Sequence, residues 1–271
     1  MKLKEINFNL LPAVVFLAMC LPLATAWSKD PPEMPTSVMC DGLPLVPVTT
    51  MEGFCMGLVA QGFEFPRGVL PLASGEILVV DMGGWGPRKG SLWRVVKRDG
   101  AYKKIRLLRG LDRPHAIVKS PVGLIYVAST DRVSILEMDA STARLVDVIG
   151  GDSDVDPLPT SGRHPLKQLV FDSAGNLFVN IGSASDNCEL PNEKKGSKRG
   201  VCKEATGPGQ RGVIRKYNIR PYGGFDPDWE IHASGLRNSM GMAFEPVNQT
   251  LWQVENARDA ISKYDPKLDD K

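Results

Sequence analysis

The chain has 271 residues, with 33 Lys and Arg against 31 Asp and Glu, so its formal net charge is +2. This near-neutral balance excludes the strongly basic composition that nucleic-acid-binding proteins use, and it gives no reason to expect attraction to a membrane surface. The length is enough for one large all-β domain or two small ones.

The first residues have the features of an export signal. Lys2 and Lys4 give a positive start, residues 10–23 are almost wholly apolar, and Ala24-Thr25-Ala26 is a small-residue cleavage site. Two prolines interrupt the apolar run, which is shorter than the roughly 20 residues of a membrane-spanning helix. We expect residues 1–26 to be a signal peptide and the mature chain to be periplasmic or secreted, with no membrane span left. A retained anchor is the alternative.

Four cysteines follow the signal, namely Cys40, Cys55, Cys188 and Cys202. They form two close pairs, 15 and 14 residues apart. Three pairings exist, and the local one closes two short loops at the smallest entropic cost. A four-cysteine zinc site is the rival, but it would need ligand pairs with closer spacing. We predict one disulfide in an N-terminal segment of residues 27–56 and a second within a surface loop.

A weak repeat runs through residues 57–271. A turn followed by a short apolar strand occurs four times, and the aligned positions are 48, 52 and 74 residues apart. The repeated segments are Ser74–Asp81, Val122–Ala128, Ala174–Asn180 and Asn248–Val254. The first two steps match the length of a four-stranded propeller blade, and the third contains the second cysteine loop.

Other apolar runs surround these repeats. One precedes each repeat, at residues 68–72, 116–118, 169–171 and 240–244, and further strands are predicted at 91–96, 133–137 and 212–217. Hairpins with short Gly turns dominate, and helical periodicity is absent after the signal. The order predicts an all-β propeller whose blades have two inner strands and then an outer one. A β-sandwich made of several hairpins is the alternative.

Two polar clusters stand next to the last predicted hairpin. Arg237 and Asn238 come just before its first strand, and residues 255–259 (Glu-Asn-Ala-Arg-Asp) follow its second strand. A guanidinium beside a carboxamide suits a flat anionic ligand, because Arg holds carboxylates through paired hydrogen bonds.

These clusters resemble the signature of the soluble quinoprotein glucose/sorbosone dehydrogenases, which depend on pyrroloquinoline quinone (PQQ). The resemblance includes Arg113-Pro114-His115 and residues 182–188, and it extends from about residue 57 to residue 259. It implies a β-propeller of the six-bladed type, with only about four to five blades recognisable. The chain is therefore expected to be C-terminally truncated relative to that family.

The resemblance also implies roles for particular residues. His164 precedes the third repeat, where the family has its catalytic base, and a neutral imidazole can accept the proton of an alcohol as hydride leaves carbon. A solvated loop histidine is the alternative. Arg237, Asn238 and His115 are predicted to bind the cofactor, whereas His232 has no such context and is predicted to be structural.

A calcium site is implied after the last strand. The resemblance assigns calcium to the backbone carbonyls of Ala257 and Arg258, and main-chain oxygens suit this ion. Ala257 replaces the usual Gly of the family, a difference that matters if the position needs a positive φ.

The predicted function is an exported PQQ- and calcium-dependent dehydrogenase that oxidises a sugar or sugar aldehyde and passes electrons to an external acceptor. A non-catalytic propeller that binds sugar or protein is one alternative, and a metal-dependent lactonase-type hydrolase is another. The hydrolase needs carboxylates at the starts of the inner strands. Those starts instead carry Arg67, His115, His164 and Arg237, which favours an anionic cofactor.

Overall fold

The structure is a computed structural model. It describes residues 38–140, 142–186, 203–206, 209–256 and 259. The chain divides into two compact units, Met1–Leu58 and Val59–Lys271. The predicted signal peptide of residues 1–26 and the predicted Cys188–Cys202 disulfide lie outside the described residues.

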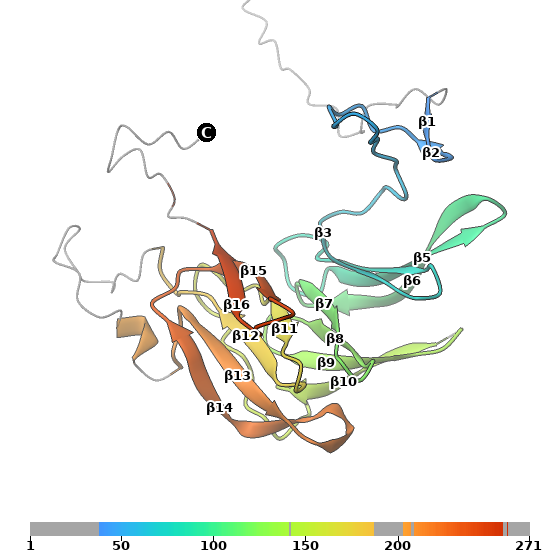
Figure 1. The fold of residues 1–271 in the computed structure, drawn as a ribbon. Coiled ribbons are helices and arrows are strands. Elements are labelled where there is room, and N and C mark those ends of the chain that lie inside the picture. The colour runs from blue at the N-terminus through green and yellow to red at the C-terminus, as the bar shows by residue number, and fades with distance from the viewer. Residues whose placement is uncertain (1–37, 141, 187–202, 207–208, 257–258, 260–271) are drawn as a thin grey trace, which may run out of the picture. The chain divides into compact units, whose positions relative to one another are not determined.

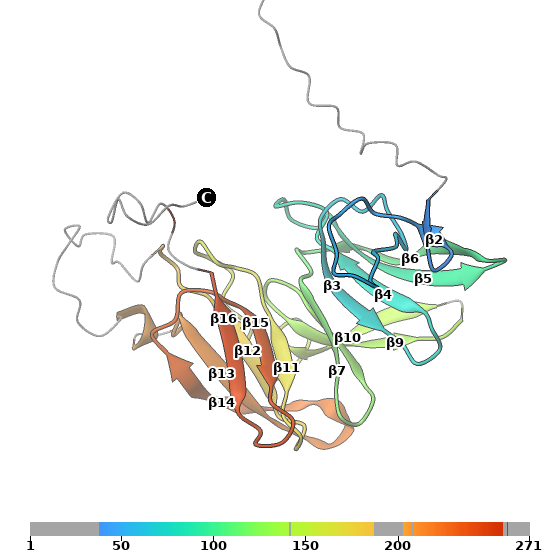
Figure 2. The same ribbon diagram turned by 45° about the horizontal axis from the view of Figure 1, so that its top comes forward.

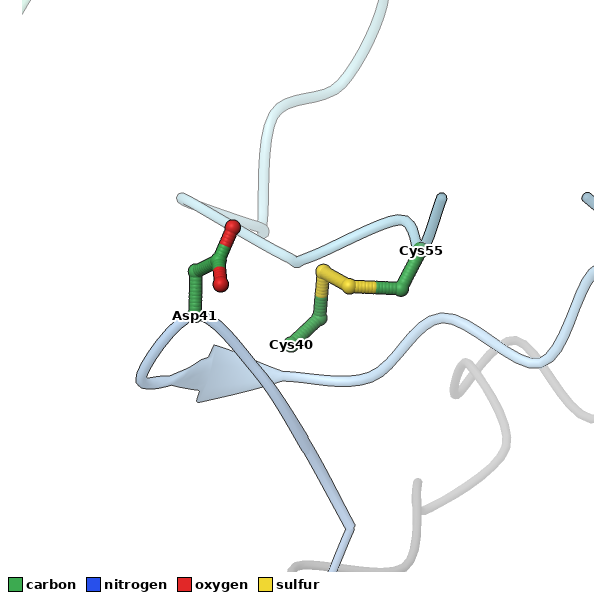
Figure 3. A group of neighbouring side chains, drawn as sticks. All are labelled: Cys40, Asp41 and Cys55. Carbon is green, nitrogen blue, oxygen red and sulfur yellow. A yellow bond between two sulfur atoms is a disulfide. The ribbon is translucent and has the colours of Figure 1, made fainter. Parts of the chain in front are cut away.

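The first unit contains a small disulfide-bonded hairpin. Strands β1 (Met39–Cys40) and β2 (Leu43–Pro44) pair through a turn in which Asp41 and Gly42 have φ angles of 50° and 79°. Cys40 and Cys55 form a disulfide with Cα atoms 5.7 Å apart, which confirms the first predicted pairing. Figure 3 shows Asp41 beside this disulfide. Because the two sulfurs are bonded to each other, they are not thiolate ligands, and the group is no metal site.

The second unit is built from antiparallel sheets (Figure 1). Its strands are β3 (Pro66–Pro71), β4 (Ile77–Asp81), β5 (Gly90–Arg98), β6 (Ala101–Leu111), β7 (Ala116–Lys119), β8 (Ile125–Ala128), β9 (Val133–Met138), β10 (Ala143–Ile149), β11 (Leu169–Phe171), β12 (Leu177–Ile181), β13 (Val213–Ile219), β14 (Phe225–Ser234), β15 (Ser239–Phe244) and β16 (Leu251–Glu255). The 3-10 turns η1 (Lys203–Ala205) and η2 (Pro221–Gly223) are the helical elements of the described part. No helix found there is long and apolar enough to cross a membrane.

Each sheet takes its strands in chain order. The sheets are β3–β6, β7–β10 and β11–β14, with four strands each, and the pair β15–β16. Such consecutive four-stranded meanders are the blades of a β-propeller. The described residues thus form three complete blades and half of a fourth, and the predicted all-β propeller architecture is confirmed.

The first strand of each blade lies next to the first strand of the following blade. β3 contacts β7, β7 contacts β11, and β11 contacts β15 (Figure 2). The inner strands therefore share one central region, and the residues at their starts come together although they are far apart in the sequence.

Apolar side chains on both faces of each blade hold the blades together. In the second blade, Val127 packs toward the first blade, whereas its neighbours Tyr126 and Ala128 pack toward the third. Successive residues of a strand point to opposite faces, so a blade buried on both sides needs an uninterrupted apolar run. This is why the inner strands could be recognised as short, wholly apolar segments.

One hydrogen bond joins the second and third blades through their core. The hydroxyl of Tyr126 donates to the carbonyl of Gly223 at 2.8 Å, and burial raises the pKa of Tyr126 to about 12. Gly223 has a φ of 85°, and a Cβ there would lie 2.7 Å from the Tyr126 oxygen. Glycine is needed here both for the backbone angle and for this close approach.

Candidate functional site

A cavity of about 520 Å³ lies at the starts of the inner strands. Its polar lining residues are Arg67, His115, Gln168 and Asn256. Arg67 is the sole charged side chain in the lining, and it has no hydrogen bond or ion pair with any other residue that the structure describes. The cavity therefore offers one unpaired cation, three neutral polar groups and no carboxylate.

His115 lines this cavity as a neutral ring. Its side chain is buried, with a relative exposure of 9%, and its Nδ1 lies 3.1 Å from the carbonyl oxygen of Lys167. A carbonyl can only accept, so Nδ1 carries the proton and Nε2 is left unprotonated. Burial, with smaller contributions from the Arg67 and Lys167 charges, lowers the pKa of His115 to about 4 against the opposing effect of the carbonyl bond. The ring is therefore neutral at pH 7.

His164 has the same arrangement on the neighbouring connection between β10 and β11. Its Nδ1 lies 2.9 Å from the carbonyl oxygen of Ser183 and 3.0 Å from the hydroxyl oxygen of that residue. The Ser183 hydroxyl itself donates to the Ser185 carbonyl, so the imidazole Nδ1–H is the donor. Burial first, and then the charge of Arg237, lowers the pKa of His164. A neutral ring with an unprotonated Nε2 is the form that a general base requires.

Gly182 lets the chain after β12 approach His164 closely. A Cβ at Gly182 would lie 2.6 Å from the His164 carbonyl oxygen and 3.3 Å from Oδ1 of Asn238. A larger residue would displace the histidine, so His164 and Asn238 converge at this glycine.

Asn238 is buried beside them, with a relative exposure of 8%. Its backbone carbonyl accepts from the Asn256 amide at 3.0 Å, but its side-chain Oδ1 has no hydrogen-bond partner in the described part of the chain. Buried polar atoms are nearly always paired. A bound group that supplies the missing hydrogen would explain this acceptor.

The Arg237 guanidinium forms hydrogen bonds and ion pairs with other residues of the chain. Its Nε donates to the Asp186 carbonyl at 2.7 Å, its Nη1 to the Asn256 carbonyl at 3.0 Å, and its Nη2 pairs with the carboxylates of Asp186 and Asp259 at 2.5 and 3.2 Å. Only 11% of its side chain is exposed. Burial raises the pKa of Asp186, but the Arg237 hydrogen bond and charge outweigh it and bring that pKa below its usual value. Arg237 thus ties the loop after β12 to the end of β16, and its role as a cofactor ligand stays a prediction.

The loop after β12 is held from its other side by Glu204 in η1. The Glu204 carboxylate accepts from the backbone amides of Ala184 and Ser185 at 2.6 and 3.0 Å. These bonds fix the segment that carries the Ser183 carbonyl and therefore the ring of His164.

The structure brings together most of the predicted site. His164, Arg237 and Asn238 form one polar cluster, and Asn256 connects it to the cavity that His115 lines. The predicted calcium ligands Ala257 and Arg258 lie outside the described residues. His232, predicted to be structural, lies in β14 with its ring edge-on to Phe178, the ring centroids 4.9 Å apart.

Gln168 was not identified from the sequence, and Arg67 was named there only as one of the basic residues at the starts of the inner strands. Gln168 immediately precedes β11, and Arg67 is the second residue of β3. Both could have been found from the propeller topology, because residues at the starts of inner strands face the common centre.

Comparison with known proteins agrees with this fold. The blades arranged around a polar cavity define a β-propeller. The family model described as TrAA12-like matches residues 48–270, and the chain belongs to this TrAA12-like family.

Individual relatives are distant. A pyrroloquinoline quinone-dependent sugar dehydrogenase from Hypocrea jecorina (strain QM6a) is 25% identical over 226 residues, which are 78% of this chain and 48% of that protein. The calcium structure of a Trichoderma reesei carbohydrate-active enzyme of family AA12 has a TM-score of 0.55 at 22% identity and covers 75% of this chain and 48% of its own. The iodide structure of the same enzyme gives a TM-score of 0.54 at 22% identity, covering 74% and 48%. The chain thus spans about half the length of these relatives.

Proposed function

We propose that this chain binds PQQ at the polar end of its inner strands and belongs to an exported dehydrogenase that oxidises a sugar or sugar aldehyde, with electrons passing to an external acceptor. The observation that carries the proposal is His164, whose Nδ1–H is bonded to the Ser183 carbonyl and whose Nε2 is left free to take a proton. The family membership and the activity named for the Hypocrea relative support it.

The cavity residues fit an anionic, planar ligand that carries several carboxylates. Arg67 offers an unpaired guanidinium, no lining residue is acidic, and Gln168 and Asn256 offer amide groups. The neutral His115 adds an acceptor rather than a second charge. Arg67, His115, Gln168 and Asn256 would hold the cofactor, and Asn238 would supply an acceptor next to His164.

PQQ, when bound, supplies an acceptor for the hydride that leaves the substrate carbon. This chain contributes the proton acceptor, because Nε2 of His164 takes the hydroxyl proton of the substrate. Ser183 keeps the ring in the productive tautomer, and Glu204 keeps the Ser183 segment in place. The lowered pKa of His164 keeps the base unprotonated at neutral pH.

Calcium is the second proposed cofactor. The carbonyl groups of Ala257 and Arg258 would hold it by resemblance, and one of the two Trichoderma structures similar to this chain is a calcium structure. Calcium accepts main-chain oxygens in variable number, so such a site needs no carboxylate cluster.

The test is a titration of the purified mature chain with PQQ, with and without calcium, followed by the absorbance of the quinone. Dye-linked oxidation of a panel of aldoses and sugar aldehydes is measured in parallel. We expect saturable binding that calcium strengthens, and turnover that disappears in His164→Ala while binding remains. A well-folded protein that does not bind PQQ would contradict the proposal.

The commitment of Arg237 to Asp186, Asn256 and Asp259 favours a second candidate, a binding module without turnover. In this case the guanidinium stabilises the fold and leaves fewer groups for the cofactor. A folded protein that binds a sugar of the panel, but neither binds PQQ nor oxidises any of the sugars, would select this candidate.

A further inference from the structure

Lys167 is a buried cation between the two histidines of the site. Its side chain is 1% exposed, and its Nζ donates to the carbonyl oxygens of Pro159 and Pro165 at 3.0 and 2.6 Å. It has no ion pair with any carboxylate in the part of the chain that the structure describes. Burying an ammonium group without a carboxylate partner is unfavourable, because its desolvation is not offset by an ion pair. An apolar side chain in the same space would have no such desolvation cost.

The segment that Lys167 contacts explains why a donor is needed there. Residues 150–168 connect β10 to β11 without forming a strand, and this connection carries His164. Pro157, Pro159 and Pro165 have no N–H group, so the connection cannot build a regular ladder of backbone hydrogen bonds. Buried carbonyls require donors from elsewhere, and Lys167 reaches back to supply two of them.

The position of Pro165 makes one of these bonds important for His164. Pro165 follows His164 directly, so its carbonyl fixes the backbone one residue after the histidine. On the other side, the Arg163 amide donates to the Ala184 carbonyl at 2.9 Å. The two bonds hold the histidine from both neighbours.

The backbone of Lys167 acts on the other histidine. Its carbonyl accepts the Nδ1–H of His115, and the next amide, that of Gln168, donates to Oδ1 of the buried Asn180. The acceptor that determines the His115 tautomer is therefore itself fixed.

We propose that Lys167 is a positioning residue that holds His164 through its ammonium group and His115 through its carbonyl, so that both rings keep the proton on Nδ1. This inference rests on the proposed function, which gives His164 the role of the base. Burial lowers the pKa of Lys167 to about 7, and an uncharged amine still has the two hydrogens that the proline carbonyls require. The hydrogen bonds from the Lys167 Nζ to the two proline carbonyls are therefore possible in both protonation states.

The experiment records the ring ¹⁵N resonances of the three histidines by NMR, in the cofactor-free protein and in Lys167→Met. In the unsubstituted protein, we expect His115 and His164 to carry the proton on Nδ1. In Lys167→Met, His164 should lose this pattern and show a mixture of tautomers. His115 should change less, since the Gln168 amide still anchors its acceptor. His232 is the internal reference and should not change.

Two further variants control the interpretation. Lys167→Arg keeps hydrogen-bond donors at this position, so His164 should keep the proton on Nδ1. Lys104→Met removes another lysine that donates to a carbonyl, that of Gly62, in the first blade, and it should leave all three histidines as they are. Unchanged His164 resonances in a folded Lys167→Met protein would overturn the proposal.

The unsubstituted protein provides an outcome that does not depend on the folding of any variant. A proton on Nε2 of both His115 and His164 would overturn the proposal even if Lys167→Met does not fold. Because the measurement uses neither PQQ nor sugar, its result is independent of the titration that tests the proposed function.

Discussion

The two ends of the inner strands differ sharply in chemistry. At their starts, Arg67, His115, Gln168 and Asn256 line the cavity of about 520 Å³. At their far ends, a second cavity of about 430 Å³ is lined mainly by apolar residues, with Leu70, Val118, Val170 and Phe171 among them. β3 and β7 contribute to both cavities, and the residue just before β11, Gln168, lines the first cavity while β11 itself lines the second, so the difference arises along single strands.

This contrast indicates which end of the inner strands is suited to a ligand. Ligand sites combine an apolar surround with a few convergent polar groups. The first cavity has four such groups, whereas the second has Lys119 and Ser120 among mainly apolar residues. The strand middles are fixed by the need to bury both faces of a blade. The starts of the strands do not have to bury both faces, and they carry the polar side chains that line the first cavity.

The largest expected effect is on turnover. Replacement of His164 by Ala removes the proposed proton acceptor, and we expect the rate of sugar oxidation to fall by about 10²- to 10⁴-fold. PQQ affinity should remain, because His164 does not line the cavity. Steady-state oxidation assays measure the rate, with His232→Ala as the matched control. Full activity of His164→Ala would show that His164 is not the general base.

The second prediction concerns pH. The folded-state pKa of His115 is about 4, below its ordinary 6.5, so between these values the unfolded chain binds a proton that the folded chain does not. The contribution of His115 to stability is therefore complete above about pH 6.5 and is lost as the pH falls toward 4, by about 3 kcal/mol in total.

Denaturant unfolding at several pH values between 4 and 7.5 tests this effect. The free energy of unfolding should fall less steeply toward acid pH in His115→Gln than in the unsubstituted protein. Parallel curves for the two proteins would show that His115 titrates normally and is not buried as a neutral ring.

The third prediction sharpens the contrast between the two cavities. Arg67→Met removes the unpaired cation from the polar end, and hydrogen bonds to charged groups contribute about 1.5–3 kcal/mol. We expect the Kd for PQQ to rise by about 10- to 100-fold. Arg109→Met, which changes an exposed arginine on the outer strand β6 of the same blade, should leave the Kd unchanged. Equal losses in the two variants would indicate a general effect of charge.

The smallest effect is expected at the apolar end. Val170→Ser changes a lining residue of the second cavity, and it should alter the Kd for PQQ by less than about twofold while reducing stability by about 1 kcal/mol. Isothermal titration and thermal unfolding measure the two quantities. A large loss of PQQ affinity in Val170→Ser would indicate that the ligand binds at the apolar cavity and would contradict the proposed site.

The inner strands could be predicted from the sequence because both faces of a blade are buried. Runs such as Ile77–Asp81 and Leu177–Ile181 are apolar, short and preceded by Gly turns, and they are all observed as strands. The outermost strands β6, β10 and β14 were not predicted. β6 alternates exposed Lys and Arg with half-buried residues, and β14 contains Pro227 and two aspartates, so neither shows the apolar pattern of a strand.

The identity of several site residues could be predicted from the sequence, but their hydrogen-bond and ion-pair partners could not. The resemblance selected His164, Asn238 and Arg237, which the fold does bring together. The sequence could not show that the Arg237 guanidinium forms ion pairs with Asp186, which lies 51 residues away, and with Asp259. In the same way, nothing in a lysine next to a glutamine indicates that Lys167 turns inward to the carbonyls of two prolines.

The most direct test of the central claim is a crystal structure of the mature chain with PQQ bound. We predict that density for the quinone lies against Arg67, His115, Gln168 and Asn256, with Nε2 of His164 facing the substrate side. Density at the apolar end, against Leu70, Val118 and Phe171, would contradict the account.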